Sequence, residues 1–221
     1  MIPGSHFKPE GHIMKIAVIG SGNMGSAFVK QLRKAGHAVS VTSRNETSAS
    51  ALAASHGATV VAASKVRDAE IIILATGAAD AIPALKAAGN LSGKVVVDIT
   101  NPLTADYMGL TIGHSTSNAE EIAKAIPGVR LVKGFNTIFA QLLGAGAALP
   151  NGGKVSVFIA SDDADAKKTV TTLAQSMGFA VTDAGPLKNA RYLEPLAGLN
   201  IYLGYGAGRG TSISPTWVEA V

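Results

Sequence analysis

The sequence contains no cysteine, and only 15% of its residues are charged and 5% aromatic. Without cysteine the chain can form no disulfide, no thiolate nucleophile and no cysteine-ligated metal centre. Because no disulfide calls for an oxidising compartment, we expect a cytoplasmic location. The low charge content, with 47% hydrophobic residues and 25 glycines, is typical of a closely packed α/β protein and argues against a disordered chain.

Runs of one charge sign are also missing. The formal net charge is +4, but lysine and arginine are dispersed along the chain without basic clusters or interleaved aromatic residues. Nucleic-acid surfaces usually concentrate positive charge on one face or stripe. The composition therefore predicts a small polyanionic ligand and no nucleic-acid partner.

Long hydrophobic runs are absent as well. Residues 1–13 carry no apolar run of the kind found in a secretory signal, and we expect them to be a leader or a loose tail. The one long uncharged stretch, 134–153, is interrupted by Asn136, Gln141 and Pro150 and by several glycines. We therefore predict no membrane span and expect this stretch to be buried or to face a ligand.

The most informative segment is a glycine-rich turn near the start of the chain. An apolar run, 16–19, leads directly into Gly20, and a helical pattern begins a few residues later. In such a strand–turn–helix unit, Gly20 allows a sharp turn, Gly22 leaves room for a pyrophosphate and Gly25 allows close packing of the helix. The free N–H groups and the positive end of the helix dipole then face phosphates. The predicted dinucleotide-binding residues of this turn are Gly20, Ser21, Gly22, Asn23, Met24 and Gly25.

The end of the second predicted strand, 38–42, indicates which dinucleotide binds. An Asp or Glu at this place would accept hydrogen bonds from the adenosine 2′-hydroxyl and select NAD. The sequence instead has Ser43, Arg44 and Asn45, which can all donate to phosphate oxygens. We therefore predict NADP(H) as the cofactor. The alternative is that Arg44 is a solvated loop residue that binds no phosphate.

Strands and helices alternate from residue 16 onward, which predicts an α/β fold with a Rossmann-type, doubly wound parallel sheet. We expect an NADP-binding domain over 14–135 and a small C-terminal α+β region over 136–221. A helix is expected over 80–88, with Pro83 in its first turn, where proline is tolerated. A short strand is expected over 58–63.

Ligands of open α/β sheets bind outside the carboxyl ends of the strands. Three further strand ends are therefore predicted to line the cofactor site. They contribute Ala75 and Thr76, Asn101 and Pro102, and Phe135 and Asn136. The irregular segment 104–116 is long for a connection and is a candidate functional loop.

No catalytic set is found among the polar residues. The sequence shows no metal-ligand spacing, no Ser/His/Asp arrangement and no carboxylate pair, so we predict no catalytic side chain and no metal. Asp98, at a strand end, is interpreted as a cap for a nearby backbone N–H. The role of His114, a lone histidine in the candidate loop, stays open.

Four segments resemble the family of F420-dependent NADP oxidoreductases, which includes the NADPH-binding domain of the STEAP metalloreductases. They are the turn 20–25, the residues 43–45, Gly134-Phe-Asn-Thr137, and 183–194, which reads Asp-Ala-Gly-Pro-Leu-Lys-Asn-Ala-Arg-Tyr-Leu-Glu. The resemblance implies hydride transfer between NADPH and coenzyme F420 in a cleft covered by the C-terminal region. Such transfer between stacked rings needs position and a dry pocket more than a general acid. Apolar walls of this cleft are expected from Phe135, Ile138, Leu193 and Leu196.

Several alternatives stay open. FMN, FAD or a quinone-like molecule could replace F420 as the small-molecule hydride acceptor. The same cofactor site would also suit a non-catalytic NADP(H) sensor. Pyrroline-5-carboxylate reductases and β-hydroxyacid dehydrogenases begin with a similar glycine turn, but they need a long helical C-terminal domain that the sequence after Pro150 does not resemble. The apolar segment 196–203 suggests either a homodimer interface or a wall for the acceptor.

Overall fold

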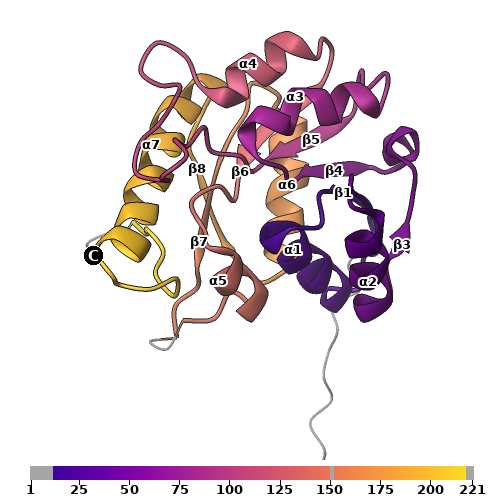
Figure 1. The fold of residues 1–221 in the computed structure, drawn as a ribbon, viewed down its shortest axis with the longest axis horizontal. Coiled ribbons are helices and arrows are strands. Elements are labelled where there is room, and N and C mark those ends of the chain that lie inside the picture. The colour runs from indigo at the N-terminus through magenta and orange to yellow at the C-terminus, as the bar shows by residue number, and fades with distance from the viewer. Residues whose placement is uncertain (1–11, 150–151, 218–221) are drawn as a thin grey trace, which may run out of the picture.

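The computed structural model describes residues 12–149 and 152–217, and its centre is one eight-stranded sheet (Figure 1). The strand order is β3-β2-β1-β4-β5-β6-β7-β8. The strands are β1 (Lys15–Ile19), β2 (Ala38–Thr42), β3 (Thr59–Val60), β4 (Ile71–Leu74), β5 (Val95–Asp98), β6 (Arg130–Gly134), β7 (Ser156–Ala160) and β8 (Ala180–Asp183). The first six strands are mutually parallel, and their order is that of a Rossmann sheet, which confirms the predicted fold class.

The C-terminal strands continue this sheet. β7 pairs with β6 in antiparallel register, joining Lys133 to Ala160 and Gly134 to Ile159, and β8 then pairs with β7 in parallel. A division of the chain after residue 135 therefore falls between two strands that are hydrogen-bonded to each other.

Helices cover both faces of the sheet. The α-helices are α1 (Asn23–Lys34), α2 (Glu46–His56), α3 (Ala78–Ala87), α4 (Asn118–Ala125), α5 (Ala140–Ala145), α6 (Ala164–Ser176) and α7 (Ala190–Ile201). The 3₁₀-helices are η1 (Ala63–Asp68) and η2 (Leu187–Asn189), and the short π-helix η3 (Tyr202–Gly206) continues α7. One hydrophobic cluster joins α1, α2, α5 and α6 to one face, and a second joins η1, α3 and α4 to the other. Alternate residues of β1 and β4 belong to different clusters, because successive side chains of a strand point to opposite faces.

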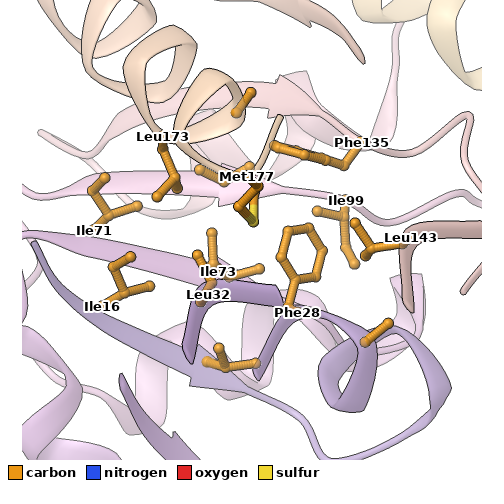
Figure 2. Packing of buried hydrophobic residues seen from close by; sticks show 14 of the residues in the cluster. Ile16, Phe28, Leu32, Ile71, Ile73, Ile99, Phe135, Leu143, Leu173 and Met177 are labelled. Carbon is orange, nitrogen blue, oxygen red and sulfur yellow. The ribbon is translucent and has the colours of Figure 1, made fainter. Parts of the chain in front are cut away.

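The first cluster is the larger core, and aromatic rings meet near its centre (Figure 2). The Phe135 ring lies 5.0 Å from that of Phe28 and 6.1 Å from that of Phe179, both edge to face. Phe135 is completely buried and has a positive φ of 60°, unusual for a residue with a side chain. The backbone therefore turns sharply where β6 ends, and the ring anchors that turn in the core.

Two local predictions are corrected. α3 begins at Ala78, two residues earlier than expected, so Pro83 lies inside the helix and not in its first turn. Its ring is on the exposed side, where the hydrogen bond that proline cannot donate is lost next to solvent. The third strand is also shorter than expected, since only Thr59 and Val60 pair with β2, at the edge of the sheet.

Two helices begin with a side-chain cap. Ser117 caps α4 and accepts from the Glu120 N–H, and Asp163 caps α6 and accepts from the Ala166 N–H. Within the described residues, no helix is long and apolar enough to cross a bilayer.

Candidate functional site

The glycine turn between β1 and α1 is sterically closed at two positions and open at the third. A Cβ on Gly20, which has φ of 117°, would lie 2.2 Å from the Ala75 carbonyl oxygen. A Cβ on Gly25 would lie 2.0 Å from the Gly20 oxygen, whereas one on Gly22 would meet nothing within 4 Å. Gly20 and Gly25 are therefore required by the fold itself, while Gly22 borders free space. Gly22 caps α1 without a side-chain acceptor, so the first amides of the helix are left for a ligand.

A cavity of about 780 Å³ opens beside this turn, at the carboxyl ends of β4 and β5. It is bordered by Gly22 and Met24 from the turn, by the segment 75–79 after β4 and by the segment 99–105 after β5. The predicted residues Asn23, Ala75, Thr76, Asn101 and Pro102 all line it. Tyr107, Thr111 and Ile112 line it too, which places part of the candidate loop 104–116 at the cavity.

A smaller pocket of about 210 Å³ adjoins this cavity and shares Met24, Asn101 and Tyr107 with it. Its remaining walls come from the segment 136–141 after β6 and from α7 and η3. The rings of Phe139 and Tyr205 meet edge to face there, with centroids 5.5 Å apart. Aromatic and aliphatic walls around a few polar groups are typical of a pocket for a planar ring.

Asparagines connect the two cavities to α7. The Asn101 amide donates to the Asn136 carbonyl oxygen at 2.8 Å, and the Asn136 amide donates to Asn101 Oδ1 and to the Leu193 carbonyl oxygen, each at 2.9 Å. Two buried acceptors beside the smaller pocket, Asn136 Oδ1 and Thr137 Oγ1, have no hydrogen-bond partner among the described residues. Such groups are costly unless something bonds to them, so this corner of the site is prepared for a polar partner.

A third groove, of about 620 Å³, lies beside the end of β2 and is lined by Ser43 and Arg44 on one side and by α3 on the other. Ser43 Oγ accepts from Ser21 Oγ at 2.9 Å and from the Asn45 N–H at 3.3 Å. Because Ser43 Oγ is the acceptor in both hydrogen bonds, its own proton is left to be donated to another group. Asn45 uses its side-chain oxygen to cap α2 through the Ser48 N–H, which leaves its amide group as a donor.

Arg44 projects over this groove. Its side chain is 85% exposed, and one guanidinium nitrogen lies 2.7 Å from a carboxylate oxygen of Asp80 in the first turn of α3. The sequence analysis identified Arg44 but not its partner, because the two residues are far apart in the chain. The contact joins the segment after β2 to the first turn of α3.

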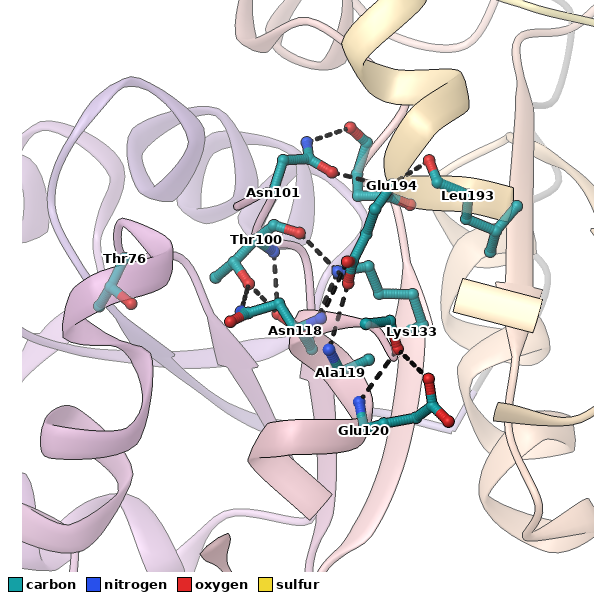
Figure 3. A network of polar contacts seen from close by, with 12 residues as sticks. Thr76, Thr100, Asn101, Asn118, Ala119, Glu120, Lys133, Leu193 and Glu194 are labelled. Atoms are coloured by element: carbon teal, nitrogen blue, oxygen red, sulfur yellow. Dashed lines mark hydrogen bonds and ion pairs between the residues drawn. The ribbon is translucent and has the colours of Figure 1, made fainter. Parts of the chain in front are cut away.

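Beneath the cavities lies a buried ionic cluster that the sequence analysis missed (Figure 3). Lys133 Nζ lies 2.9 Å from Asp98 Oδ2 and 2.8 Å from Glu194 Oε1, and it also donates to the Thr100 carbonyl oxygen. All three charged side chains are essentially inaccessible to solvent. Asp98 also accepts from the Thr100 N–H at 2.9 Å, which confirms its predicted role as a backbone cap.

Glu194 ties α7 to the rest of the cluster. Its two carboxylate oxygens accept the N–H groups of Asn118 and Ala119, the first residues of α4, at 2.9 and 3.1 Å. The helix dipole at this end also favours a negative charge. The C-terminal helix is thereby fixed to the strand ends that form the cavities. The sequence signal that could have revealed this cluster is Lys133, which follows two apolar residues inside the strand β6, whereas Arg130 stands at the start of that strand.

A second ion pair strengthens the same junction. Arg191 donates to both carboxylate oxygens of Glu120, at 2.8 and 2.6 Å, and Glu120 also accepts from the Ser117 hydroxyl. The Arg191 guanidinium holds the pKa of the Glu120 carboxyl below its usual value. Two residues of the segment 183–194 therefore act as anchors of α7.

Other predicted residues lie outside the cavities. The Phe135 side chain is in the core and lines none of the three, although its backbone shapes the turn before Asn136. Of the four apolar walls expected, only Ile138 lines a pocket, while Leu193 and Leu196 pack near Phe158. His114 is exposed and lines none of these cavities. Within the described chain no group of three or more His, Asp or Glu could hold a metal ion.

Comparison with known proteins identifies this arrangement. Residues 15–102 match the family model described as NADP oxidoreductase, coenzyme F420-dependent. A solved structure from Arthrobacter sp. FB24, assigned as an F420-dependent NADP reductase, is 34% identical, with a TM-score of 0.81 over 90% of this chain and 96% of that one. An imine reductase from Pseudomonas sp., 21% identical over 89% of this chain and 64% of its own, has a TM-score of 0.65 and shares the fold.

Metalloreductase STEAP3 from Rattus norvegicus is 33% identical over 182 residues, which are 82% of this chain. The chain spans only 36% of the length of that protein. Because the Arthrobacter structure is matched at 34% identity along nearly its whole length, the chain belongs to the family of F420-dependent NADP oxidoreductases.

Proposed function

We propose that the protein binds NADPH along the carboxyl edge of the sheet and passes its hydride to a planar heteroaromatic acceptor of the deazaflavin or flavin class. The observation that carries this proposal is the order of the three cavities. The groove at β2, the glycine turn at β1, the cavity at β4 and β5, and the pocket beside β6 and α7 follow the spatial order of the strands. An extended dinucleotide followed by a second ring matches that order.

The residues of the chain fit the parts of NADPH. Ser43 and Arg44 would hold the 2′-phosphate, since the serine proton and the guanidinium can both donate to it. The space beside Gly22 and the amides at the start of α1 would take the pyrophosphate. The cavity bordered by Thr76 and Asn101 would take the nicotinamide end.

NADPH supplies a hydride when bound, and the protein's part is to orient the rings and exclude water. Met24, Tyr107 and Tyr205 border the smaller pocket and would shield the transfer from solvent. The unpartnered acceptors of Asn136 and Thr137 would bond to donors on the edge of the bound ring. No carboxylate, histidine, lysine or arginine is among the described residues that line the two cavities, which agrees with a transfer that draws its one proton from solvent: acceptor, NADPH and a proton give the reduced acceptor and NADP⁺.

The test is the anaerobic oxidation of NADPH by the purified protein, followed at the nicotinamide absorbance, with F420, FMN and FAD as separate acceptors. Turnover with at least one acceptor is expected, and the preferred one identifies the acceptor class. NADPH binding without turnover on any of them would contradict the enzymatic proposal and favour a redox sensor.

The placement of the 2′-phosphate gives a separate prediction. Arg44→Ala should weaken NADPH binding about tenfold or more, since it removes a charge-assisted contact with a phosphate, and should change NADH binding little. Calorimetric titration with both nucleotides measures the two affinities. Lys65→Met, which removes an exposed cation elsewhere, is the matched control. Equal losses for both nucleotides would overturn this placement.

A further inference from the structure

Asp80, in the first turn of α3, pairs with a residue that lines the groove at the end of β2, and the cofactor motifs do not account for it. Its carboxylate oxygen lies 2.7 Å from Arg44 Nη2. Among the residues that line the groove, Arg44 is the one cation and Glu46 adds another carboxylate. The guanidinium proposed to bind the phosphate therefore already has an anionic partner within the protein.

We propose that Asp80 is a specificity-determining residue that competes with the 2′-phosphate of NADPH for the Arg44 guanidinium. This inference rests on the proposed placement of that phosphate at Arg44. A phosphate monoester carries up to two negative charges near neutral pH, and a carboxylate on the same guanidinium lies close enough to repel it. NADH has no 2′-phosphate, so the competition affects NADPH alone.

The opposite role, in which Asp80 holds Arg44 ready for the phosphate, is disfavoured by exposure. The side chains of Arg44 and Asp80 are 85% and 42% exposed. Ion pairs this exposed hold their side chains only weakly, so little order is gained before the ligand arrives. The repulsion arises only when the phosphate binds beside Asp80, and because these groups are exposed it is strongest at low ionic strength. Asp80 thus limits how strongly the protein prefers NADPH.

The experiment compares NADPH and NADH affinities of the wild type, Asp80→Asn, Arg44→Ala and the double variant by calorimetric titration. Asp80→Asn is expected to tighten NADPH binding roughly three- to tenfold at low ionic strength, with NADH binding unchanged and a smaller gain at high salt. The gain should vanish in the Arg44→Ala background, because Asp80 acts through that residue. Asp80→Glu, which restores the charge, should return the affinity toward wild type.

The matched control is Asp68→Asn, which removes a carboxylate that is 65% exposed and that pairs with Lys65. Weaker or unchanged NADPH binding in Asp80→Asn would overturn the inference, as would equal tightening for NADH or a gain that persists without Arg44. If Arg44→Ala weakens both nucleotides equally, the placement of the phosphate itself fails. The Arg44→Ala variant shows that outcome by itself, so a failed phosphate placement can be distinguished from a failed role of Asp80.

Discussion

Lys133→Met is expected to lower the free energy of unfolding by about 3–5 kcal/mol, the range found when one partner of a buried ion pair is removed. The variant keeps most of the side-chain volume but leaves Asp98 and Glu194 buried without their shared cation. Typical domains are stable by only about 5–15 kcal/mol, so the loss would remove much of the margin. Urea unfolding followed by circular dichroism measures it.

The controls separate charge from packing. Lys65→Met removes a lysine that is 64% exposed and should change stability by less than about 1 kcal/mol. Adding Asp98→Asn and Glu194→Gln to Lys133→Met should recover part of the loss, because no unpaired charge then stays buried. A cost below about 1 kcal/mol for Lys133→Met, or no recovery in the triple variant, would show that the cluster does not stabilise the fold through charge.

Gly25→Ala and Gly22→Ala are expected to separate folding from cofactor binding. Gly25→Ala places a methyl group 2.0 Å from the Gly20 carbonyl oxygen, a contact between backbone atoms that no side-chain rotation relieves. We expect a loss of about 3 kcal/mol or more, or no folded protein. Gly22→Ala meets no atom within 4 Å and should change stability by less than about 1 kcal/mol.

For cofactor binding, the effect is expected in Gly22→Ala, the variant whose stability should change little. The methyl group of Gly22→Ala would occupy the space proposed for the pyrophosphate, so NADPH affinity should fall about tenfold or more, equivalent to about 1.4 kcal/mol. Thermal unfolding and calorimetric titration of the folded variant measure the two quantities. Unchanged affinity in Gly22→Ala would place the pyrophosphate elsewhere, and a stable Gly25→Ala protein would contradict the steric argument.

Local signals in the sequence mark several residues that the structure brings to one cavity. The glycine turn and the strand ends at Ala75 and Asn101 both depend on residues close together in the chain. Such features follow from backbone geometry and from the period of buried side chains, which a sequence displays directly. Pro83 was placed wrongly because the start of α3 carries no capping side chain to mark it.

Phe135 shows the limit of strand-end reasoning. Its place after β6 predicted a ligand contact, and its backbone does form the turn before Asn136, but its ring packs with Phe28 and Phe179. Which way a side chain points after a strand depends on the φ angle at that residue, here 60°, and on the neighbours that accept the ring. Neither is visible in the residue type.

The sequence by itself determined the α/β architecture, and it predicts the dinucleotide turn and the phosphate-binding residues 43–45, because each depends on residues close together in the chain. The tertiary structure alone decided which groups meet across the sheet: Lys133 with Asp98 and Glu194, Arg44 with Asp80, and Asn101 with Asn136. Lys133 is 35 residues from Asp98 and 61 residues from Glu194 in the chain. Since these partners are brought together only when the strands align in the sheet and the helices α3 and α7 pack beside it, their pairing is a property of the assembled fold and not of any segment.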